Sequence, residues 1–267
     1  MMKRFLTLVL LLSLTLVSLS AQKALVIGNS GYASKSLPQP ARDAALIDST
    51  LAQSGWTVTN HQNLGPLALK TALSQFNNTL AEGEMAMVYF SGAVIQLDGL
   101  NYLVPVGIFK DAATFKNSAV ELNWAISQLS KAGVKLIFLD GARSPANIGF
   151  KLAKPGMAAL AKLPGNTLLM YGSPLDTVLV DSPAPNSYFS KALAAEIIKP
   201  DLDLSVLPAN ISAAMAILQG GKTPPQPWSA SSVPEGWTLN PSGENMPRYH
   251  FRGMFKMDVD GGGSYSF

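Results

Sequence analysis

The chain has 267 residues, a formal net charge of +3, two histidines and no cysteine. The missing thiols exclude disulfides, thiolate metal sites and cysteine nucleophiles, and two histidines are too few for a histidine-rich metal centre. The weak positive charge is scattered rather than gathered in a basic run with aromatic residues, so nucleic-acid binding is not indicated. We expect no metal and no cofactor, and the length suits one large domain with a substantial core.

A secretory signal peptide is predicted over residues 1–21. Lys3 and Arg4 form its positive start, residues 5–19 are apolar, and small residues lead to Ala21. The apolar run is shorter than the roughly 20 residues that a spanning helix prefers. We expect cleavage and a periplasmic or extracellular protein; an uncleaved membrane anchor is the alternative. No later run is apolar and long enough to span a membrane, so we expect no membrane span after cleavage.

Apolar runs typical of strands alternate along the chain with segments whose apolar residues recur at helical spacing. Strands are predicted at 23–28, 56–59, 85–92, 134–140 and 166–172. Helices are predicted around Ala44–Leu51, Leu69–Leu80, Val120–Leu129, Phe189–Ile197 and Leu204–Leu218. The dipeptide Asp98-Gly99, which lies between apolar residues, predicts a hairpin within residues 95–104.

The runs at 85–90 and 136–139 are continuously hydrophobic, which is typical of strands buried on both faces of a parallel sheet. We therefore predict a three-layer α/β/α sandwich with a mostly parallel sheet of about six strands and a small hairpin. Asp43 is expected in the first turn of its helix, where a carboxylate is favourable against the helix dipole. Sites in such folds lie at the carboxyl ends of the strands.

Two neighbouring strand ends present alanine where a site is expected. Ala93 follows the strand at 85–92, and Ala142 follows the strand at 134–140. Alanine can neither accept a proton nor attack a substrate. The small and polar residues around these positions are candidate groove residues, namely Ser91, Gly92, Gln96, Asp140 and Arg143.

Several blocks of the sequence resemble the caspase-like domain of peptidase family C14, of the bacterial metacaspase and orthocaspase type. They read KALVIGNSGYAS, LPQPARDAALIDSTLAQSGWTV, MVYFSGAVIQLDGLNYLVPV, KLIFLDGAR, NSYFSKALAAEI and TPPQPWSASS. The resemblance implies a caspase-like domain of the p20 type over residues 22–233. A Pro/Gly-rich tail over residues 234–267 would follow it.

The resemblance also implies that both catalytic residues are missing. The family's third strand ends in Gly-His-Gly, where this chain has Gly92-Ala93-Val94. Its fourth strand ends in Asp-Ala-Cys-Arg, where this chain has Asp140-Gly141-Ala142-Arg143. The family histidine position is thus Ala93 and the family cysteine position is Ala142, so no residue is assigned a catalytic role.

Peptide cleavage by this route needs a thiolate and a nearby base. We therefore predict an exported caspase-fold pseudoprotease that binds a peptide or protein partner without cleavage. One alternative is a residual hydrolase with a non-cysteine site, but Ser91 or Ser144 would need a base within hydrogen-bond reach. The two histidines, His61 and His250, lie far from both serines in sequence. Another alternative is a structural envelope-assembly protein whose working part is the tail after Lys222.

Other residues have a structural interpretation beside the functional one. Residues 28–31 (Gly-Asn-Ser-Gly) predict a tight turn rather than a phosphate loop, because the GxGxxG spacing is missing. Asp140 either belongs to a recognition pocket or caps a loop. Arg143 pairs either with an acidic ligand or with Asp140 itself, and pairing with Asp140 is favoured. A structural role is favoured for Gln96. The aromatic and basic residues around His250 either grip a partner or pack back on the domain.

Overall fold

A twisted sheet organises the molecule, which is described by a computed structural model over residues 22–33, 36–142, 154, 156–178, 184–221 and 226–242. The sheet strands are β1 (Lys23–Gly28), β2 (Thr57–Gln62), β3 (Met85–Leu97), β4 (Leu100–Leu103), β5 (Val120–Glu121), β6 (Val134–Ala142), β7 (Thr167–Tyr171) and β9 (Trp228–Ser231). Their order is β2-β1-β3-β6-β7-β9, with β4 and β5 attached beside β3. A separate small sheet pairs β8 (Leu202–Asp203) with β10 (Thr238–Leu239).

The pairing confirms the prediction of a mostly parallel sheet. Strands β2, β1, β3, β6 and β7 run parallel to their neighbours, and β9 closes one edge in the antiparallel direction. Strand β3 is longer than predicted, since it continues to Leu97 and turns back into β4. The predicted hairpin is confirmed, because Asp98 (φ 53°) and Gly99 (φ 77°) both adopt the left-handed conformation that a tight hairpin turn requires.

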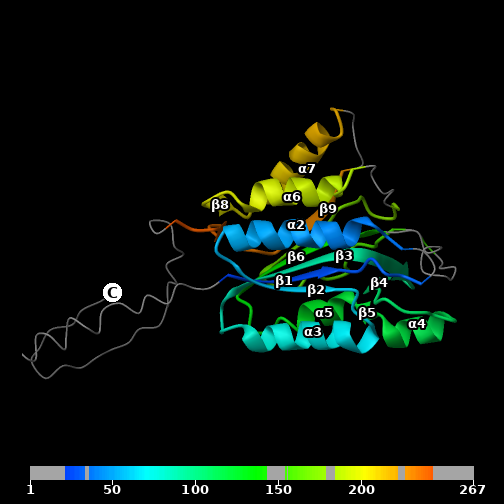
Figure 1. Cartoon of the computed structure of the whole chain (residues 1–267). Coiled ribbons are helices and arrows are strands. Elements are labelled where there is room, and N and C mark those ends of the chain that lie inside the picture. Colours follow the sequence, from blue (N-terminus) through cyan, green and yellow to red (C-terminus); the bar gives the residue numbers. More distant parts are fainter. Residues whose placement is uncertain are drawn as a thin grey trace, which may run out of the picture.

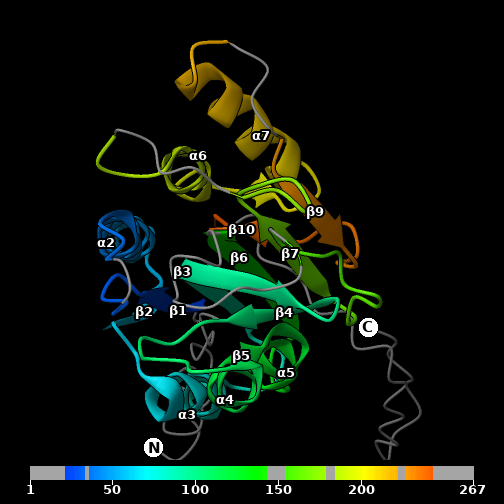
Figure 2. The same ribbon diagram turned by 90° about the vertical axis from the view of Figure 1, so that its right-hand side faces the viewer.

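Helices cover both faces of the sheet and make the three layers of the sandwich (Figure 1). Helices α2 (Gln39–Gln53), α6 (Tyr188–Ile197) and α7 (Leu207–Leu218) lie on one side. Helices α3 (Pro66–Thr79), α4 (Ala112–Ser118) and α5 (Leu122–Ser127) lie on the other. The view along the sheet in Figure 2 places β2 and β9 at its two edges.

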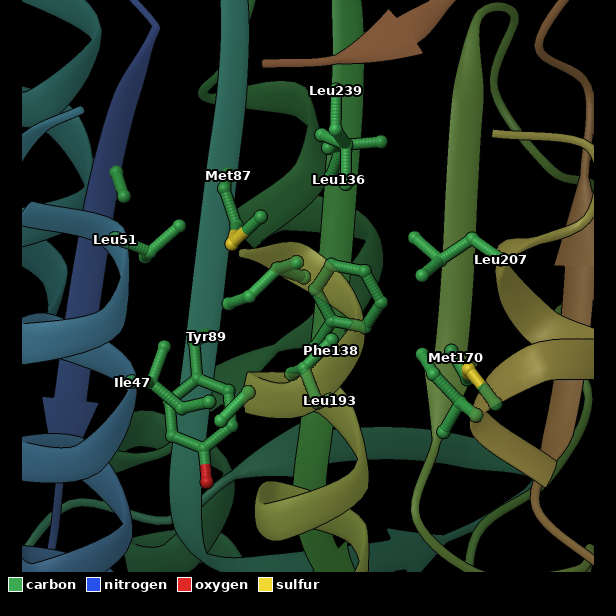
Figure 3. Close-up of a cluster of buried hydrophobic side chains, with 14 of the residues drawn as sticks. Ile47, Leu51, Met87, Tyr89, Leu136, Phe138, Met170, Leu193, Leu207 and Leu239 are labelled. Carbon is green, nitrogen blue, oxygen red and sulfur yellow. The ribbon is translucent and has the colours of Figure 1, made fainter. Parts of the chain in front are cut away.

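Each layer buries the apolar stripe that its sequence predicts. Helix α2 buries Ala44, Ile47 and Leu51 against the sheet. Gly55, just after the helix, adopts a φ of 83°, the left-handed conformation that commonly terminates a helix. In Figure 3, Ile47 and Leu51 of α2 lie in the same cluster as Met87 and Tyr89 of β3. The intervening residues of β3 pack under the opposite face, so the strand is buried throughout. The continuous hydrophobicity of β3 follows from this double cover.

The structure differs from the sequence prediction at several points. Asp43 is not in the first turn of α2, which holds no acidic residue; it lies one turn further and is fully buried. Helix α4 and strands β8, β9 and β10 were not predicted, and residues 120–121 are a strand rather than part of a helix. Trp237 and Leu239, which fall in the predicted tail, pack into the hydrophobic core. Residues 1–21, Arg143, Ser144 and His250 lie outside the described residues.

Among the described residues, no helix is both long enough and apolar enough to cross a bilayer.

Candidate functional site

The parallel pairing of β3 with β6 ends in a β-bulge at the two alanines. Ser91 pairs with Asp140, and the next pair in register is Val94 with Ala142. Gly92 and Ala93 therefore stand opposite Gly141 alone, which is the two-against-one arrangement of a bulge. Bulges of this kind redirect side chains and are frequent beside active sites.

The backbone around Ala93 is held by a tyrosine that sequence reasoning missed. The amide of Ala93 donates to the Tyr32 hydroxyl at 2.8 Å, and that hydroxyl donates to the Val104 carbonyl at 3.0 Å. The Ala93 carbonyl accepts from the Val104 amide at 2.9 Å. A Cβ on Gly92 would lie 2.8 Å from the Tyr32 hydroxyl, so the close approach of the ring requires glycine there. The loop after β1 and the end of β4 thus fix this strand end.

Ala142, at the family cysteine position, is likewise fully buried. It belongs to the core cluster on the α3 side of the sheet, whereas Ala93 belongs to a smaller cluster with Tyr32 and Phe115. A Cβ on Gly141 would lie 2.3 Å from Cγ2 of Val94. The Val94 side chain therefore occupies the space that a side chain at position 141 would need.

Two fully buried carboxylates converge behind these strand ends. Asp43 of α2 accepts from the amide of Ser187 at 2.9 Å and from the Asn186 side chain at 3.0 Å. Asp140 of β6 accepts from the hydroxyls of Ser187 and Ser190, the latter at 2.8 Å. Ser187 therefore contacts both carboxylates and is also the N-cap of α6, accepting from the Ser190 amide at 2.9 Å. These bonds tie α6 to α2 and β6.

A buried phenol completes this polar network. The hydroxyl oxygens of Tyr89 and Ser190 lie 2.6 Å apart. Burial raises the pKa of Tyr89 well above its usual value, and the carboxylates of Asp140 and Asp43 raise it further; hydrogen bonds with Ser190 and Ser91 act in the opposite direction. The phenol is therefore held as a neutral partner of the serine.

The structure brings four of the five candidate groove residues to this edge of the sheet. Ser91, Gly92, Gln96 and Asp140 all lie on β3 or β6 and are buried. Gln96 donates to the Asp176 carboxylate at 2.9 Å, which supports its structural role. Among the described residues, Asp140 accepts from the side-chain hydroxyls of Ser187 and Ser190 at the start of α6. Whether these residues line an open groove stays a prediction, as does the pairing of Arg143.

A serine–histidine pair is not formed by the described residues. Ser91 faces α2, where its hydroxyl lies 3.5 Å from Asp43. His61 lies on β2, with β1 between that strand and β3, and lines a hollow with residues of α3 on the opposite face. The sheet therefore separates the two side chains. Within the part of the chain that the structure describes, no three histidine or carboxylate side chains gather to hold a metal ion.

The loop after β1 has a structural role. The side-chain oxygen of Asn63 accepts from the amides of Ser30 and Gly31 at 2.9 and 2.8 Å. The side chain of Asn29 accepts from the Leu64 amide at 2.9 Å and donates to the Val104 carbonyl at 3.2 Å. The backbone amides that a phosphate loop would offer to a ligand are thus used within the protein, in agreement with the predicted turn.

The burial of Asp43 could have been predicted from its spacing in the sequence. It lies four residues before Ile47 and eight before Leu51, which places it on the buried stripe of its helix. A carboxylate on an apolar stripe predicts a buried partner rather than a dipole interaction. Tyr32, in contrast, lies in a loop with no periodicity to place it.

A mostly parallel sheet between two helical layers, with one antiparallel edge strand, defines a three-layer α/β domain. The family described as the caspase domain matches residues 21–235, and the chain therefore belongs to peptidase family C14. The solved structure of pro-Sf-caspase-1 is similar with a TM-score of 0.57 and 14% identity, over 85% of this chain and 92% of that one. At this identity the likeness shows the fold alone. No curated protein matches the sequence. The predicted family and fold are confirmed.

Proposed function

We propose that this chain is an exported caspase-fold pseudoprotease that binds a peptide or protein partner without cutting it. The observation that carries the proposal is alanine at both family catalytic positions, Ala93 and Ala142, on strand ends that keep the sheet and its bulge. Cleavage by a cysteine route needs a nucleophile and a base, and removal of either takes away most of the rate acceleration.

Binding is supported by the place of these strand ends in the fold. Ligands of open parallel sheets bind outside the carboxyl ends of the strands. Here the predicted groove residues Ser91, Gly92, Gln96 and Asp140 lie on β3 and β6 at that end of the sheet. The hydrogen bonds of Ser187 and Asp43 hold α6 rigidly against it, and a fixed scaffold lowers the entropy cost of ordering a bound chain.

Export is the second part of the proposal and rests on the sequence of residues 1–21 alone. We expect the mature protein in the periplasm or the medium, with its first residue near position 22. Cell fractionation followed by N-terminal sequencing tests this directly. A protein in the membrane fraction that still begins at Met1 would support the uncleaved anchor instead.

The absence of cleavage is tested on the purified chain with peptides that contain Arg, Lys or Asp. We expect no hydrolysis above background. Activity that follows the protein through purification, and that disappears on Ser91→Ala, would replace the pseudoprotease by a serine-based hydrolase.

Restoration of the family motifs tests whether the site is still formed. Ala93→His and Ala142→Cys should be combined with Val94→Gly and Gly141→Ala, because the Val94 side chain occupies the space at position 141. We expect this variant to react with a thiol-directed peptide probe. A folded but unreactive variant would argue that the groove is lost.

Partner binding is tested with a photo-reactive amino acid at Asp176, an exposed residue bonded to Gln96. The control carries the same group at the exposed Ser205, on the other side of the fold between β8 and α7. We expect cross-linking in the native envelope fraction from position 176 and not from position 205. Equal labelling from both sites would contradict a groove partner.

A further inference from the structure

Strand β2 forms an open edge of the sheet. Among the described residues its only strand partner is β1. Its sequence, TVTNHQ, contains neither proline nor a charged residue, which are the usual means of protecting an edge from further pairing. The opposite edge strand, β9, has four residues with Pro227 before it and Pro234 shortly after it. Of the two edges, β2 is therefore the one built to accept another strand.

An apolar hollow lies beside this edge. It has a volume of about 460 Å³ between the end of β2 and α3, with Leu64, Leu67, Ala68 and Thr71 in its wall. Leu67 is 79% exposed, so its side chain adds open apolar surface at this hollow. His61 of β2 also lines the hollow, whereas Asn60 points to the other face and donates to Asp48 of α2. A strand added to β2 would thus place every second side chain on the face of the sheet where the hollow lies.

A segment of the chain beyond the described residues has the matching pattern. Over 248–260 the odd positions hold Tyr249, Phe251, Gly253, Phe255, Met257 and Val259. The even positions are charged or polar except for Met254, and read Arg, His, Arg, Met, Lys, Asp and Asp. Alternation of this kind, interrupted only at Gly253 and Met254, predicts a strand with one apolar face, which needs a partner sheet and an apolar surface to cover it.

The described chain ends where this segment can reach β2. Ser242 is fixed by two hydrogen bonds of 2.6 Å to Asp201, and the Asn240 side chain accepts from the Trp56 indole at 2.8 Å. Trp56 directly precedes β2. The six residues from 242 to 248 span up to about 20 Å, which is about the length of β2 itself. Both ends of the strand are therefore within reach.

We propose that residues 248–260 of this chain add a strand to the open edge of β2 and cover the hollow between β2 and α3 with their apolar side chains. Addition of an extended segment to a sheet edge gives affinity through main-chain hydrogen bonds and selectivity through alternate side chains. The basic residues of the other face would lie on the α2 side, where Asp48 is located. The aromatic and basic stretch around His250 then packs back on its own domain.

Hydrogen exchange on the full chain tests the docking. We expect the amides of 249–259 to exchange at least tenfold more slowly than in a free peptide of that sequence. Leu67→Glu should remove this protection. Ile108→Glu is the matched control, since Ile108 is 75% exposed but lies outside the hollow, and it should leave the protection unchanged. Exchange of 249–259 at the free-peptide rate, or equal loss in both variants, would overturn the proposal.

Cross-linking identifies the surface that is covered, and the absence of cysteine makes the result unambiguous. Thr71→Cys, in the wall of the hollow, is paired with Phe255→Cys and treated with a short bifunctional thiol reagent. The control pairs Ser205→Cys with Phe255→Cys; residue 205 neighbours β8, which lies beside the point where the described chain ends, so an undocked segment would reach it readily. We expect an intramolecular product mainly from the Thr71 pair. Equal products from the two pairs, or a product between two chains only, would overturn docking on the same chain.

Discussion

Position 141 has no room for a side chain while Val94 is present. A Cβ there would lie 2.3 Å from Val94 Cγ2 and 3.0 Å from its Cβ. In the family pattern that this chain resembles, the two positions are alanine and glycine; here they are Gly141 and Val94. The larger side chain is therefore on β3 at position 94 in this chain, whereas in the family pattern it is on the neighbouring strand at position 141. Together with the alanines at 93 and 142, the exchange packs the two strand ends against each other with apolar atoms.

The first prediction follows from this contact. Gly141→Ala should lower the free energy of unfolding by about 1–3 kcal/mol, because neither strand end can shift freely. In a Val94→Ala background the cost should be smaller, since the closest atom is gone. Gly165→Ala, whose Cβ would meet nothing within 4 Å, is the control and should stay within about 0.5 kcal/mol of the parent. Urea unfolding measures the free energy of unfolding of Gly141→Ala, Val94→Ala, their double variant and Gly165→Ala. If the costs of Gly141→Ala and Val94→Ala simply add in the double variant, the steric account is contradicted.

The second prediction concerns alkaline stability. Burial raises the pKa of Tyr89, and burial also raises that of Tyr171 against a weaker opposing hydrogen bond from Asn101. Below pH 10 both phenols are protonated in either state. Above pH 10 the unfolded chain releases protons that the native state keeps, so the free energy of unfolding falls as pH rises, by about 1.4 kcal/mol per pH unit for each tyrosine.

Urea unfolding between pH 9 and 11 measures this slope. Tyr171→Phe should reduce the slope. At pH 9 this variant should lose little free energy of unfolding, because Asn101 retains a bond to the Ala158 carbonyl at 2.7 Å. Phe90→Leu is the control: it removes a buried ring without a phenol, so stability should fall while the slope is unchanged. An unaltered slope in Tyr171→Phe would refute the assignment for that residue.

At the scale of single residues, the sequence identified the alanines at the two catalytic positions but not the hydrogen-bond partners of the buried polar residues. The motifs placed Ala93 and Ala142 at the ends of neighbouring strands because hydrophobic runs and their ends are local features. Tyr32, Asp43 and Ser190 were not predicted as site residues, since the bonds that join them to Ala93, Asn186 and Asp140 link positions 50 or more residues apart in sequence. Hydrogen bonds of such long range depend on the packed fold, which no local pattern contains.

Among the elements, helix α6 depends most clearly on polar contacts at its start. Its N-cap Ser187 bonds the first turn and both buried carboxylates. Helix α4 has an N-cap too, since Asp111 accepts from the Thr114 amide at 2.7 Å, but that cap is exposed to solvent. The two caps have the same local geometry and different surroundings, so their comparison separates capping from the buried network.

The third prediction is that Ser187→Ala lowers the free energy of unfolding by about 2–4 kcal/mol. The lost cap accounts for about 1 kcal/mol, and the rest comes from a buried carboxylate that loses a hydroxyl donor. Ser187→Thr keeps the hydroxyl and should recover most of the loss. Asp111→Ala should cost clearly less. Chemical unfolding decides the matter, and a Ser187→Ala variant no weaker than Asp111→Ala would show that the network contributes nothing beyond the cap.

Periodicity predicted the long elements and missed the short ones. The stripes of α2, α3 and α6 and the runs of β3 and β6 each contain enough apolar residues to define a face. Strand β9 alternates half-buried and exposed residues in a segment rich in proline and serine. Strands β8 and β10 have two residues each, so tertiary packing alone creates them. An element of two to four residues is thus too short for a hydrophobic pattern to predict it.

For the molecule as a whole, residues past the predicted boundary at 233 pack into the hydrophobic core. The predicted domain closed at 233, where the family resemblance ends and Pro, Gly and Ser become frequent. Leu239 is nevertheless fully buried and lies near Leu136 in Figure 3. The Asn240 side chain donates to the carbonyls of Ile197 and Lys199 at 2.6 and 3.0 Å, which fixes the end of α6.

The fourth prediction compares chains that end at 242 and at 233. The longer one should unfold cooperatively, since every described contact is kept. The shorter one loses the burial of Leu239 and part of Trp237, at about 25 cal/mol per Å² of apolar surface, and the Asn240 hydrogen bonds at about 1 kcal/mol each. We expect a free energy of unfolding about 3–6 kcal/mol lower. If the shorter chain does not fold, Leu239→Ala in the full chain carries the test, with an expected loss of about 2–5 kcal/mol. Equal stability of the two truncated chains, together with a neutral Leu239→Ala, would place the boundary at 233 after all.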